Sequence, residues 1–375
     1  MSPFLSTEID IGPTSQNAWL SARVREPQPR DAVLLHAPSQ VWQAPGGGEN
    51  QLIQTAEHLE KQGVVVRPFV AWTDRIEKAK VLHLFGMSRE GLELAKVAKS
   101  RGTPIALSPI CWVEPRAIAA LSVGSLETIA NLGKHAVKSF ARRLPSWRRD
   151  LIELADAILP NSRAEGEQLV RLFGADKRRI RVVPNGVDLR FKTGSPIEFQ
   201  SRHGQSPFIL YVGRIEPRKN VFNLILAAET AGLPLVVIGD PVPGFEAYDA
   251  ACRTRGKGFA RFLPRVDHAD PALGSAYAAC CVFALPSWFE TPGLAALEAG
   301  LAAKPVVITP YGCTQEYFLN HVIYARPDRV EEIARGLRRG WEEGADSRLS
   351  ARIEERFLWS EAARATREAY DEIAR

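Results

Sequence analysis

The segment PSWFETPGLAALEAG, residues 286–300, carries two glutamates eight positions apart. An apolar run that reads as a buried strand ends near Leu285, Glu290 follows it, and Glu298 lies in the helical stretch beyond. Ligands of open α/β sheets bind at the carboxyl ends of parallel strands. The spacing therefore predicts two carboxylates at two depths of one crevice, suited to a hydroxyl-rich ligand. A helix with solvent-exposed glutamates is the alternative interpretation.

The residues between the two glutamates favour a helix that begins at the crevice. Thr291 is the expected N-cap, and Pro292 is expected in the first turn. Gly293 removes a side chain from that turn, so a ligand could approach bare backbone N–H groups at the positive helix end.

A basic turn follows the apolar run of LYVGRIEPRKN, residues 210–220. Gly213 ends the run, and Arg214 and Lys219 lie on the turn into the next helical segment. Two cations beside backbone amides form a clamp for a diphosphate. Such a clamp would stabilise the charge that grows on a departing diphosphate. A solvated basic turn is the alternative, because Arg218 shows that not every cation here need point inward.

Three consecutive glycines occur in APGGGEN, residues 44–50, between the first apolar run and a helical segment. Gly47 and Gly48 give the backbone freedom to wrap an anion at the helix start. The spacing matches neither the dinucleotide-binding fingerprint nor the phosphate loop of nucleoside triphosphatases. A flexible loop without a ligand is the alternative.

The elements that must position these residues alternate along the whole chain, which is typical of parallel α/β architecture. The apolar runs are rich in Val, Ile and Leu without polar alternation, as expected for strands covered on both faces. The expected strands are 32–36, 64–69, 80–85, 104–107, 157–159, 179–183, 208–212, 235–238, 259–262, 281–285, 306–308 and 322–324. The expected helices include 50–61, 88–101, 221–231, 293–302 and 360–375.

A polar stretch rich in Gly and Pro, within 189–207, divides the chain into two halves of comparable size. With 375 residues the chain is long enough for two full cores with a cleft between them. The predicted organisation is a partly disordered lead-in (1–30), a first domain (31–190), a linker (191–206), a second domain (207–355) and a terminal helix (356–375).

The composition excludes several other classes of protein. Hydrophobic residues make up 45% and charged residues 24%, as in ordinary soluble globular proteins, and this excludes a disordered chain. The net charge of +5 favours anionic partners. The five cysteines lack the spacing of a zinc site or a disulfide framework and suit a reducing cytosol. No signal peptide, membrane-spanning helix or nucleic-acid-binding motif is expected.

Together these segments resemble the signatures of glycosyltransferase family 4, which is a family of retaining, nucleotide-sugar-dependent enzymes. The resemblance runs from about residue 31 to the end and also rests on RIRVVPNGVDLRF (179–191) and ADAILPNSRAEGEQL (155–169). It implies the GT-B fold, in which two Rossmann-like domains face each other across a cleft. The last helix would cross back to pack on the first domain.

The resemblance also implies roles for the residues singled out above. Glu290, with the backbone of residues 291–293, would hold the hydroxyls of the donor sugar, and Glu298 would bind the ribose. Arg214 and Lys219, after Gly213, match the family's diphosphate-binding pair. The residues of the glycine loop that approach the phosphates and the acceptor would be Gly47 and Gly48. Transfer would proceed without a metal ion or other cofactor, with retention at the anomeric carbon and no protein nucleophile.

The sequence departs from the family pattern in two places. Many members have a His–Asp pair at the end of the fourth strand, where this chain has Ser108 and Pro109. Ser108 is therefore expected on the acceptor side, and His83, near the end of VLHLF, becomes a candidate for the catalytic histidine. A buried core histidine without a catalytic role is the alternative. Pro264 replaces the glycine often found near the nucleobase, so no base preference is predicted.

A basic stretch with interleaved apolar residues spans 134–149, with six Lys or Arg and no acidic residue. Such a stretch can rest on an anionic membrane surface. It predicts a cytoplasmic enzyme with peripheral membrane contact near a lipid-linked acceptor. A solvated face whose apolar stripe packs on the first domain is the alternative.

The sequence thus predicts a hexosyl-transferring enzyme that moves a sugar from a nucleotide diphosphate sugar to an acceptor hydroxyl. The expected acceptor is lipid-linked or an oligosaccharide, in bacterial surface polysaccharide or glycolipid assembly. A transferase acting on a small soluble acceptor, a nucleotide-sugar epimerase and a non-catalytic sugar-nucleotide binder are the alternatives.

Overall fold

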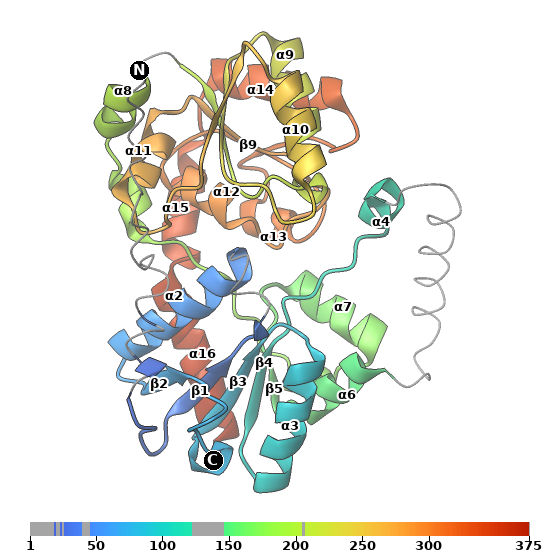
Figure 1. Cartoon of the computed structure of the whole chain (residues 1–375), viewed down its shortest axis with the longest axis vertical. Coiled ribbons are helices and arrows are strands. Elements are labelled where there is room, and N and C mark those ends of the chain that lie inside the picture. Colours follow the sequence, from blue (N-terminus) through green and yellow to red (C-terminus); the bar gives the residue numbers. More distant parts are fainter. Residues whose placement is uncertain are drawn as a thin grey trace, which may run out of the picture.

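The computed structural model describes residues 26–39, 46–121, 146–204 and 207–374, together with Trp19, Arg23 and Val24. It contains two parallel sheets, one in each half of the chain, with helices on both faces of each sheet. Figure 1 shows the halves as two lobes, with α2 of the first half facing the second half. The prediction of two parallel α/β halves is confirmed.

The first sheet has five strands in the order β2-β1-β3-β4-β5, and all neighbouring strands are parallel. Its strands are β1 (Val33–His36), β2 (Val66–Pro68), β3 (Val81–Phe85), β4 (Ile105–Ser108) and β5 (Ala157–Ile158). Within the described residues, the helices of this half are α2 (Gly47–Lys61), η2 (Ile76–Lys78), α3 (Arg89–Arg101), α4 (Pro115–Leu121), α6 (Trp147–Leu154), α7 (Arg163–Phe173) and η3 (Lys177–Arg179), where η marks a 3₁₀-helix.

The strands of the first sheet bury both of their faces. Along β1, Val33 and Leu35 pack with the side chains of α2, whereas Leu34 packs on the opposite face with residues of α3, α6 and α7. Burial of both faces accounts for the mostly apolar strands; Arg67, His83 and Ser108 are polar exceptions, and they too are buried.

The second sheet has six parallel strands in the order β11-β10-β9-β6-β7-β8. Its strands are β6 (Ile209–Val212), β7 (Leu235–Ile238), β8 (Ala260–Leu263), β9 (Val282–Leu285), β10 (Val306–Ile308) and β11 (Ile323–Tyr324). The helices of this half are η5 (Pro217–Lys219), α9 (Val221–Ala231), α10 (Glu246–Arg255), α11 (Pro271–Ala279), α12 (Leu294–Leu301), α13 (Thr314–Phe318), α14 (Val330–Glu343) and α15 (Ser347–Arg356).

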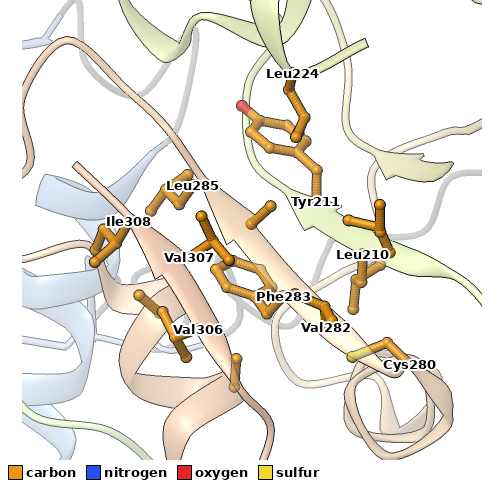
Figure 2. Packing of buried hydrophobic residues seen from close by; sticks show 14 of the residues in the cluster. Leu210, Tyr211, Leu224, Cys280, Val282, Phe283, Leu285, Val306, Val307 and Ile308 are labelled. Atoms are coloured by element: carbon orange, nitrogen blue, oxygen red, sulfur yellow. The ribbon is translucent and has the colours of Figure 1, made fainter. Parts of the chain in front are cut away.

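The core of this half is centred on β9. Figure 2 shows Phe283 of β9 among the buried side chains of the neighbouring strands, including Leu210 of β6 and Val307 of β10. All three side chains are fully buried. Because the central strands are this apolar, polar groups are confined to the loops at the strand ends, where the site lies.

The last helix, α16 (Trp359–Ile373), leaves the second half and packs on the first. It lies against α2, β4 and β5, and its buried Trp359 and Tyr370 belong to the core of the first half. The chain therefore crosses between the halves twice.

The two crossings lie side by side. Val187 and Leu358 form a parallel bridge, and the Val187 N–H donates to the Phe357 carbonyl at 2.8 Å. Gly186 permits this approach, since a Cβ there would lie 2.3 Å from the backbone nitrogen of Trp359. The two covalent connections between the halves thus touch along their backbones.

The segment between the halves differs from a plain linker. It contains η4 (Leu189–Thr193) and α8 (Ile197–His203), and the buried Phe191 and Phe199 pack into the core of the second half. Because the segment is polar in composition, its sequence pattern does not indicate that these two aromatic side chains are buried.

Two other expectations are affected by the structure. The stretch 179–183 is not a strand; it contributes a single bridge, from Ile180 to Ile158. Residues 134–145 of the basic stretch 134–149 lie outside the described residues. Of the rest, Trp147 packs against the first core and lies beneath the guanidinium of Arg148, 4.3 Å from the ring centroid. In the part of the chain that is described, no helix has the length and apolarity that crossing a membrane requires.

Candidate functional site

A cavity of about 610 Å³ lies between the two halves. One wall consists of the loops that follow β6, β7, β8 and β9, and the other includes the start of α2. The chain leaves β6 toward β7 on one side, and β9 lies on the other side. The cavity therefore sits at a topological switch point, where parallel sheets bind ligands.

The turn after β6 places three cations at the cavity: Arg214, Arg218 and Lys219. Glu216 orients two of them, accepting from Arg214 at 3.3 Å and from Arg218 at 3.0 Å. Gly213 lets the turn begin in a backbone region that disfavours side chains, with φ at +155°. Glu216 thus orients Arg214 and Arg218; that Arg214 and Lys219 clamp a diphosphate stays a prediction.

Lys219 and Glu290 form a buried ion pair at the floor of the cavity. Lys219 Nζ lies 2.6 Å from Glu290 Oε1, and an Arg218 nitrogen lies 4.0 Å from the same oxygen. Burial raises the pKa of the Glu290 carboxyl, but the charges of Lys219 and Arg218 outweigh burial and hold that pKa below its ordinary value. Burial also lowers the pKa of Lys219, against the opposing effect of Glu290. Glu290 is therefore ionised.

The backbone around Glu290 is fixed by the loop after β10. The Glu290 N–H donates to the Tyr311 carbonyl, and the Glu290 carbonyl accepts from the Cys313 N–H at 3.0 Å. Gly312 fits between them at φ +94°, and a Cβ there would lie 2.0 Å from the Glu290 carbonyl oxygen. Only glycine suits this position.

Helix α12 begins later than expected. Gly293, at φ +95°, is the N-cap and Leu294 the first helical residue, so Thr291 is not the cap and Pro292 precedes the helix. A left-handed residue cannot continue an α-helix, which explains the later start. Thr291 and Gly293 line the cavity; Pro292 does not contribute to its wall.

Glu298 lies just over one helical turn beyond Gly293 and also lines the cavity. Only 4% of the residue is exposed. Its Oε2 accepts from the Tyr277 hydroxyl at 2.6 Å, and its Oε1 lies 2.9 Å from His268 Nε2. The structure thus brings Glu290 and Glu298 to one cavity, each with its own partners.

The first half supplies the glycine loop. Gly46, Gly47 and Gly48 line the cavity at the start of α2, and the Gly46 N–H donates to the Glu49 carboxylate. A Cβ on Gly46 would lie 3.2 Å from the Arg214 guanidinium. The helix start and the basic turn therefore face the same space, a suitable arrangement for an anion.

His83 and Ser108 do not reach the cavity, and the expectation that His83 is catalytic is wrong. His83 lies in the middle of β3 and is fully buried. Its Nε2 lies 2.9 Å from Ser108 Oγ and its Nδ1 2.6 Å from the Tyr370 hydroxyl. Burial lowers the pKa of His83 to about 3. The histidine is a neutral core residue under α16, and Ser108, also buried, is its partner instead of an acceptor-side group.

His268 and Tyr277 also contribute to the site, although neither carries a strong local signal in the sequence. Tyr277 lies in the apolar helix α11, where its pattern indicates only core packing. His268 follows β8, and a lone histidine after a strand end was the available signal. Within the described ranges, no three His, Cys, Asp or Glu side chains gather as ligands for a metal ion.

Two parts of the sequence match models of known protein families. Residues 196–357 match the profile of "Glycosyl transferases group 1", and residues 124–191 match that of "Glycosyltransferase Family 4". Together the two matches span more than half of the chain.

Two curated relatives bear the name D-inositol 3-phosphate glycosyltransferase. That of Xylanimonas cellulosilytica is 32% identical over 244 residues, covering 59% of this chain and 58% of the relative. That of Kineococcus radiotolerans is 32% identical over 213 residues, covering 51% and 48%. The chain spans about half the length of the curated relatives that it matches.

Solved structures share the fold across nearly the whole chain. Anabaena HepE in complex with UDP and glucose has a TM-score of 0.67 and 17% identity, over 91% of this chain and 99% of that one. The sucrose-phosphate synthase of Thermosynechococcus elongatus has a TM-score of 0.72 and 17% identity, over 92% and 99%. The two facing sheets are thus the GT-B fold, and the chain belongs to the group 1 glycosyltransferases of family 4.

Proposed function

We propose that this protein transfers a sugar from a nucleoside diphosphate sugar to an acceptor hydroxyl in the cavity between its halves. The observation that carries the proposal is the Lys219–Glu290 ion pair, at 2.6 Å, in the same cavity as Glu298. A diphosphate sugar needs cations for its phosphates and carboxylates for its hydroxyls, and the cavity offers both.

The donor would lie across the loops of the second half. Arg214 and Lys219 would hold the diphosphate, together with the amides of Gly47 and Gly48 at the start of α2. Glu298 would accept from the ribose hydroxyls, and Glu290 from those of the sugar. UDP is a reasonable first nucleotide to test, because HepE, which shares the fold, was solved with it.

The transfer would retain the configuration at the anomeric carbon. The bond from that carbon to the phosphate oxygen breaks, the bond to the acceptor oxygen forms on the same face, and the acceptor proton passes to the departing phosphate. Glu290 is a poor candidate for a nucleophile because Lys219 engages its Oε1. The charge that grows on the diphosphate would be stabilised by Lys219 and Arg214, as electrostatic catalysis requires.

The acceptor would meet the wall supplied by the first half. That wall contains glycines and the amide side chains of Asn50, Gln51 and Asn185. Amides can donate to and accept from hydroxyl groups. A small soluble polyol is the acceptor class that we favour, and D-inositol 3-phosphate, which appears in the names of relatives, is the first compound to test.

A lipid-linked or oligosaccharide acceptor in surface polysaccharide assembly is the second candidate. The basic composition of 134–149 favours it. Retention of the protein on anionic liposomes at low salt, lost when Arg142, Arg143, Arg148 and Arg149 are neutralised, would support this candidate. Absence of retention would exclude peripheral docking through this stretch.

The proposed function is tested by a transfer assay with UDP-, GDP- and ADP-sugars against D-inositol 3-phosphate and myo-inositol. The proposal predicts release of the nucleoside diphosphate together with a glycoside of retained configuration. Loss of turnover in Glu290→Gln, with turnover kept in the surface control Glu343→Gln, is expected. Absence of both transfer and slow donor hydrolysis with every sugar nucleotide would contradict the proposal.

A further inference from the structure

The Glu298 carboxylate is held on both of its oxygens by residues that the family motifs do not include. Tyr277 donates its hydroxyl to Oε2 at 2.6 Å, and His268 Nε2 lies 2.9 Å from Oε1. Each carboxylate oxygen can accept more than one hydrogen bond. Glu298 therefore keeps acceptor capacity toward the cavity while its orientation is fixed from behind.

The tautomer of His268 follows from its other neighbour. An Arg190 nitrogen lies 3.1 Å from His268 Nδ1, and the same nitrogen donates to the His268 carbonyl. A guanidinium has donors and no acceptor, so Nδ1 must carry the lone pair. The ring proton is then on Nε2, which donates to Glu298. The hydrogen bonds run in one direction, from Arg190 through His268 to the carboxylate.

Phe191, which follows Arg190 in the chain, packs against both side chains that donate to Glu298. Its ring meets those of His268 and Tyr277 edge-on, with centroids 5.5 Å apart in each pair. Phe191 is fully buried, and the Arg190 guanidinium lies 4.8 Å from the centroid of its ring. One residue thus fixes the distance between the two side chains that hold the carboxylate.

Both supporting residues come from η4, in the segment that connects the halves. The segment is held close to α11, since a Cβ on Gly194 would lie 2.6 Å from the Gly274 carbonyl oxygen. Asp188 caps η4 by accepting from the Arg190 N–H at 2.9 Å. The connection between the halves is therefore also part of the wall behind Glu298.

We propose that Arg190 and His268 are positioning residues for the ribose of the nucleotide. They hold Glu298 oriented so that its free acceptor positions meet two neighbouring hydroxyl groups. The inference rests on the proposed function, because it takes Glu298 to face the ribose. It adds that the segment joining the halves determines the preference of the site for a ribonucleotide.

The experiment compares calorimetric dissociation constants for a nucleoside diphosphate and its 2′,3′-dideoxy form. The probe is whichever of UDP, GDP and ADP binds the wild-type protein most tightly. Wild type should prefer the ribonucleotide by about tenfold or more, since a site that hydrogen-bonds hydroxyl groups rejects ligands that lack them. His268→Leu and Arg190→Met should reduce the preference to within about threefold, with dideoxynucleotide affinity changed less than about twofold.

Two further variants separate positioning from general damage. His268→Gln should restore most of the preference, because its amide can accept from Arg190 and donate to Glu298. His321→Leu is the matched control: His321 also pairs with a carboxylate, that of Asp346 at 2.9 Å, away from the cavity. It should keep the wild-type preference.

The outcomes distinguish this inference from the proposed function. A wild-type preference that survives in both His268→Leu and Arg190→Met would overturn the positioning role and leave the proposed function standing. A wild-type protein that binds the two ligands equally well would overturn the ribose assignment of Glu298, and the inference with it. Should His268→Leu fail to fold, Arg190→Met decides, because the Arg190 side chain is about one-third exposed.

Discussion

Lys219 Nζ lies 2.6 Å from Glu290 Oε1, and this contact joins the turn after β6 to the loop after β9. The two strands are neighbours at the point where the order of the second sheet reverses. Seventy-one positions separate the residues in sequence. The pair therefore brings the proposed phosphate-binding and sugar-binding sides of the cavity into direct electrostatic contact, at the place where a departing phosphate and a sugar carbon would separate.

Replacing Glu290 by Gln should affect turnover far more than nucleotide binding. The carboxylate would stabilise the positive charge that develops on the sugar, whereas the nucleotide has other partners. We expect kcat for the best donor to fall by about 100-fold or more, with the Kd for the nucleoside diphosphate within about threefold of wild type. Steady-state kinetics and calorimetry measure the two effects. A variant with near-normal kcat would exclude Glu290 from the reaction.

Replacing Lys219 by Met should destabilise the fold, because it leaves the buried Glu290 charge with only Arg218, at 4.0 Å. Removing one partner of a buried pair costs about 3 kcal/mol. The double variant Lys219→Met/Glu290→Gln should recover part of that loss. Arg214→Met, whose side chain is 38% exposed, should unfold like wild type yet bind the diphosphate about tenfold more weakly. Urea unfolding tests the set; equal stability of Lys219→Met and Arg214→Met would argue against a buried pair.

Gly312→Ala should disrupt the site through the backbone. A Cβ there would lie 2.0 Å from the Glu290 carbonyl oxygen, so the loop after β9 must move. We expect loss of detectable turnover and a free energy of unfolding lowered by about 2 kcal/mol. Gly344→Ala is the matched control: Gly344 also has a positive φ, of +74°, with nothing within 4 Å of the added Cβ. If both variants keep wild-type turnover, the close approach at Gly312 does not hold Glu290 in place.

His83 should make the protein sensitive to mild acid. Burial lowers its folded-state pKa to about 3, against about 6.5 in the unfolded chain. The unfolded chain therefore binds the proton more readily, and the stability from this group is lost as pH falls below about 6.5. Between pH 7 and pH 5 the loss is about 2 kcal/mol. His83→Gln should reduce the decline in unfolding free energy over that interval by the same amount, as urea titrations can measure. An unchanged pH slope would show that His83 is not held neutral.

Local patterns predicted much of the fold. Helix α9 and strands β7 and β10 have the expected boundaries, because their ends coincide with changes between apolar and polar residues. The N-cap of α12 lies two residues later than expected, at Gly293 instead of Thr291, since Thr291 and Pro292 favour a helix start whereas the left-handed Gly293 excludes one before it. The left-handed backbone of Gly293 thus outweighs the preference of Thr291 for the N-cap position.

The site was predictable only where its residues carry their own local signal. Glu290 and the basic turn follow strand ends, Glu298 lies in the helix that comes next, and all of them line the cavity. His83 also stands in a strand, but whether a strand residue faces a cleft or a helix depends on α16, far away in sequence. His268 and Phe191 acquire their roles through contacts across 30 or more positions, and these contacts arise only from packing.

Calorimetric titration of the protein with UDP, GDP and ADP shows whether the cavity between the halves binds a nucleoside diphosphate. One of the three is expected to bind with a stoichiometry of one. Binding should weaken about tenfold or more in both Arg214→Ala and Glu298→Ala, and it should remain unchanged in the exposed control Arg101→Ala. If none of the three binds, or if both site variants bind as tightly as wild type, the cavity between the halves is not a nucleoside diphosphate site.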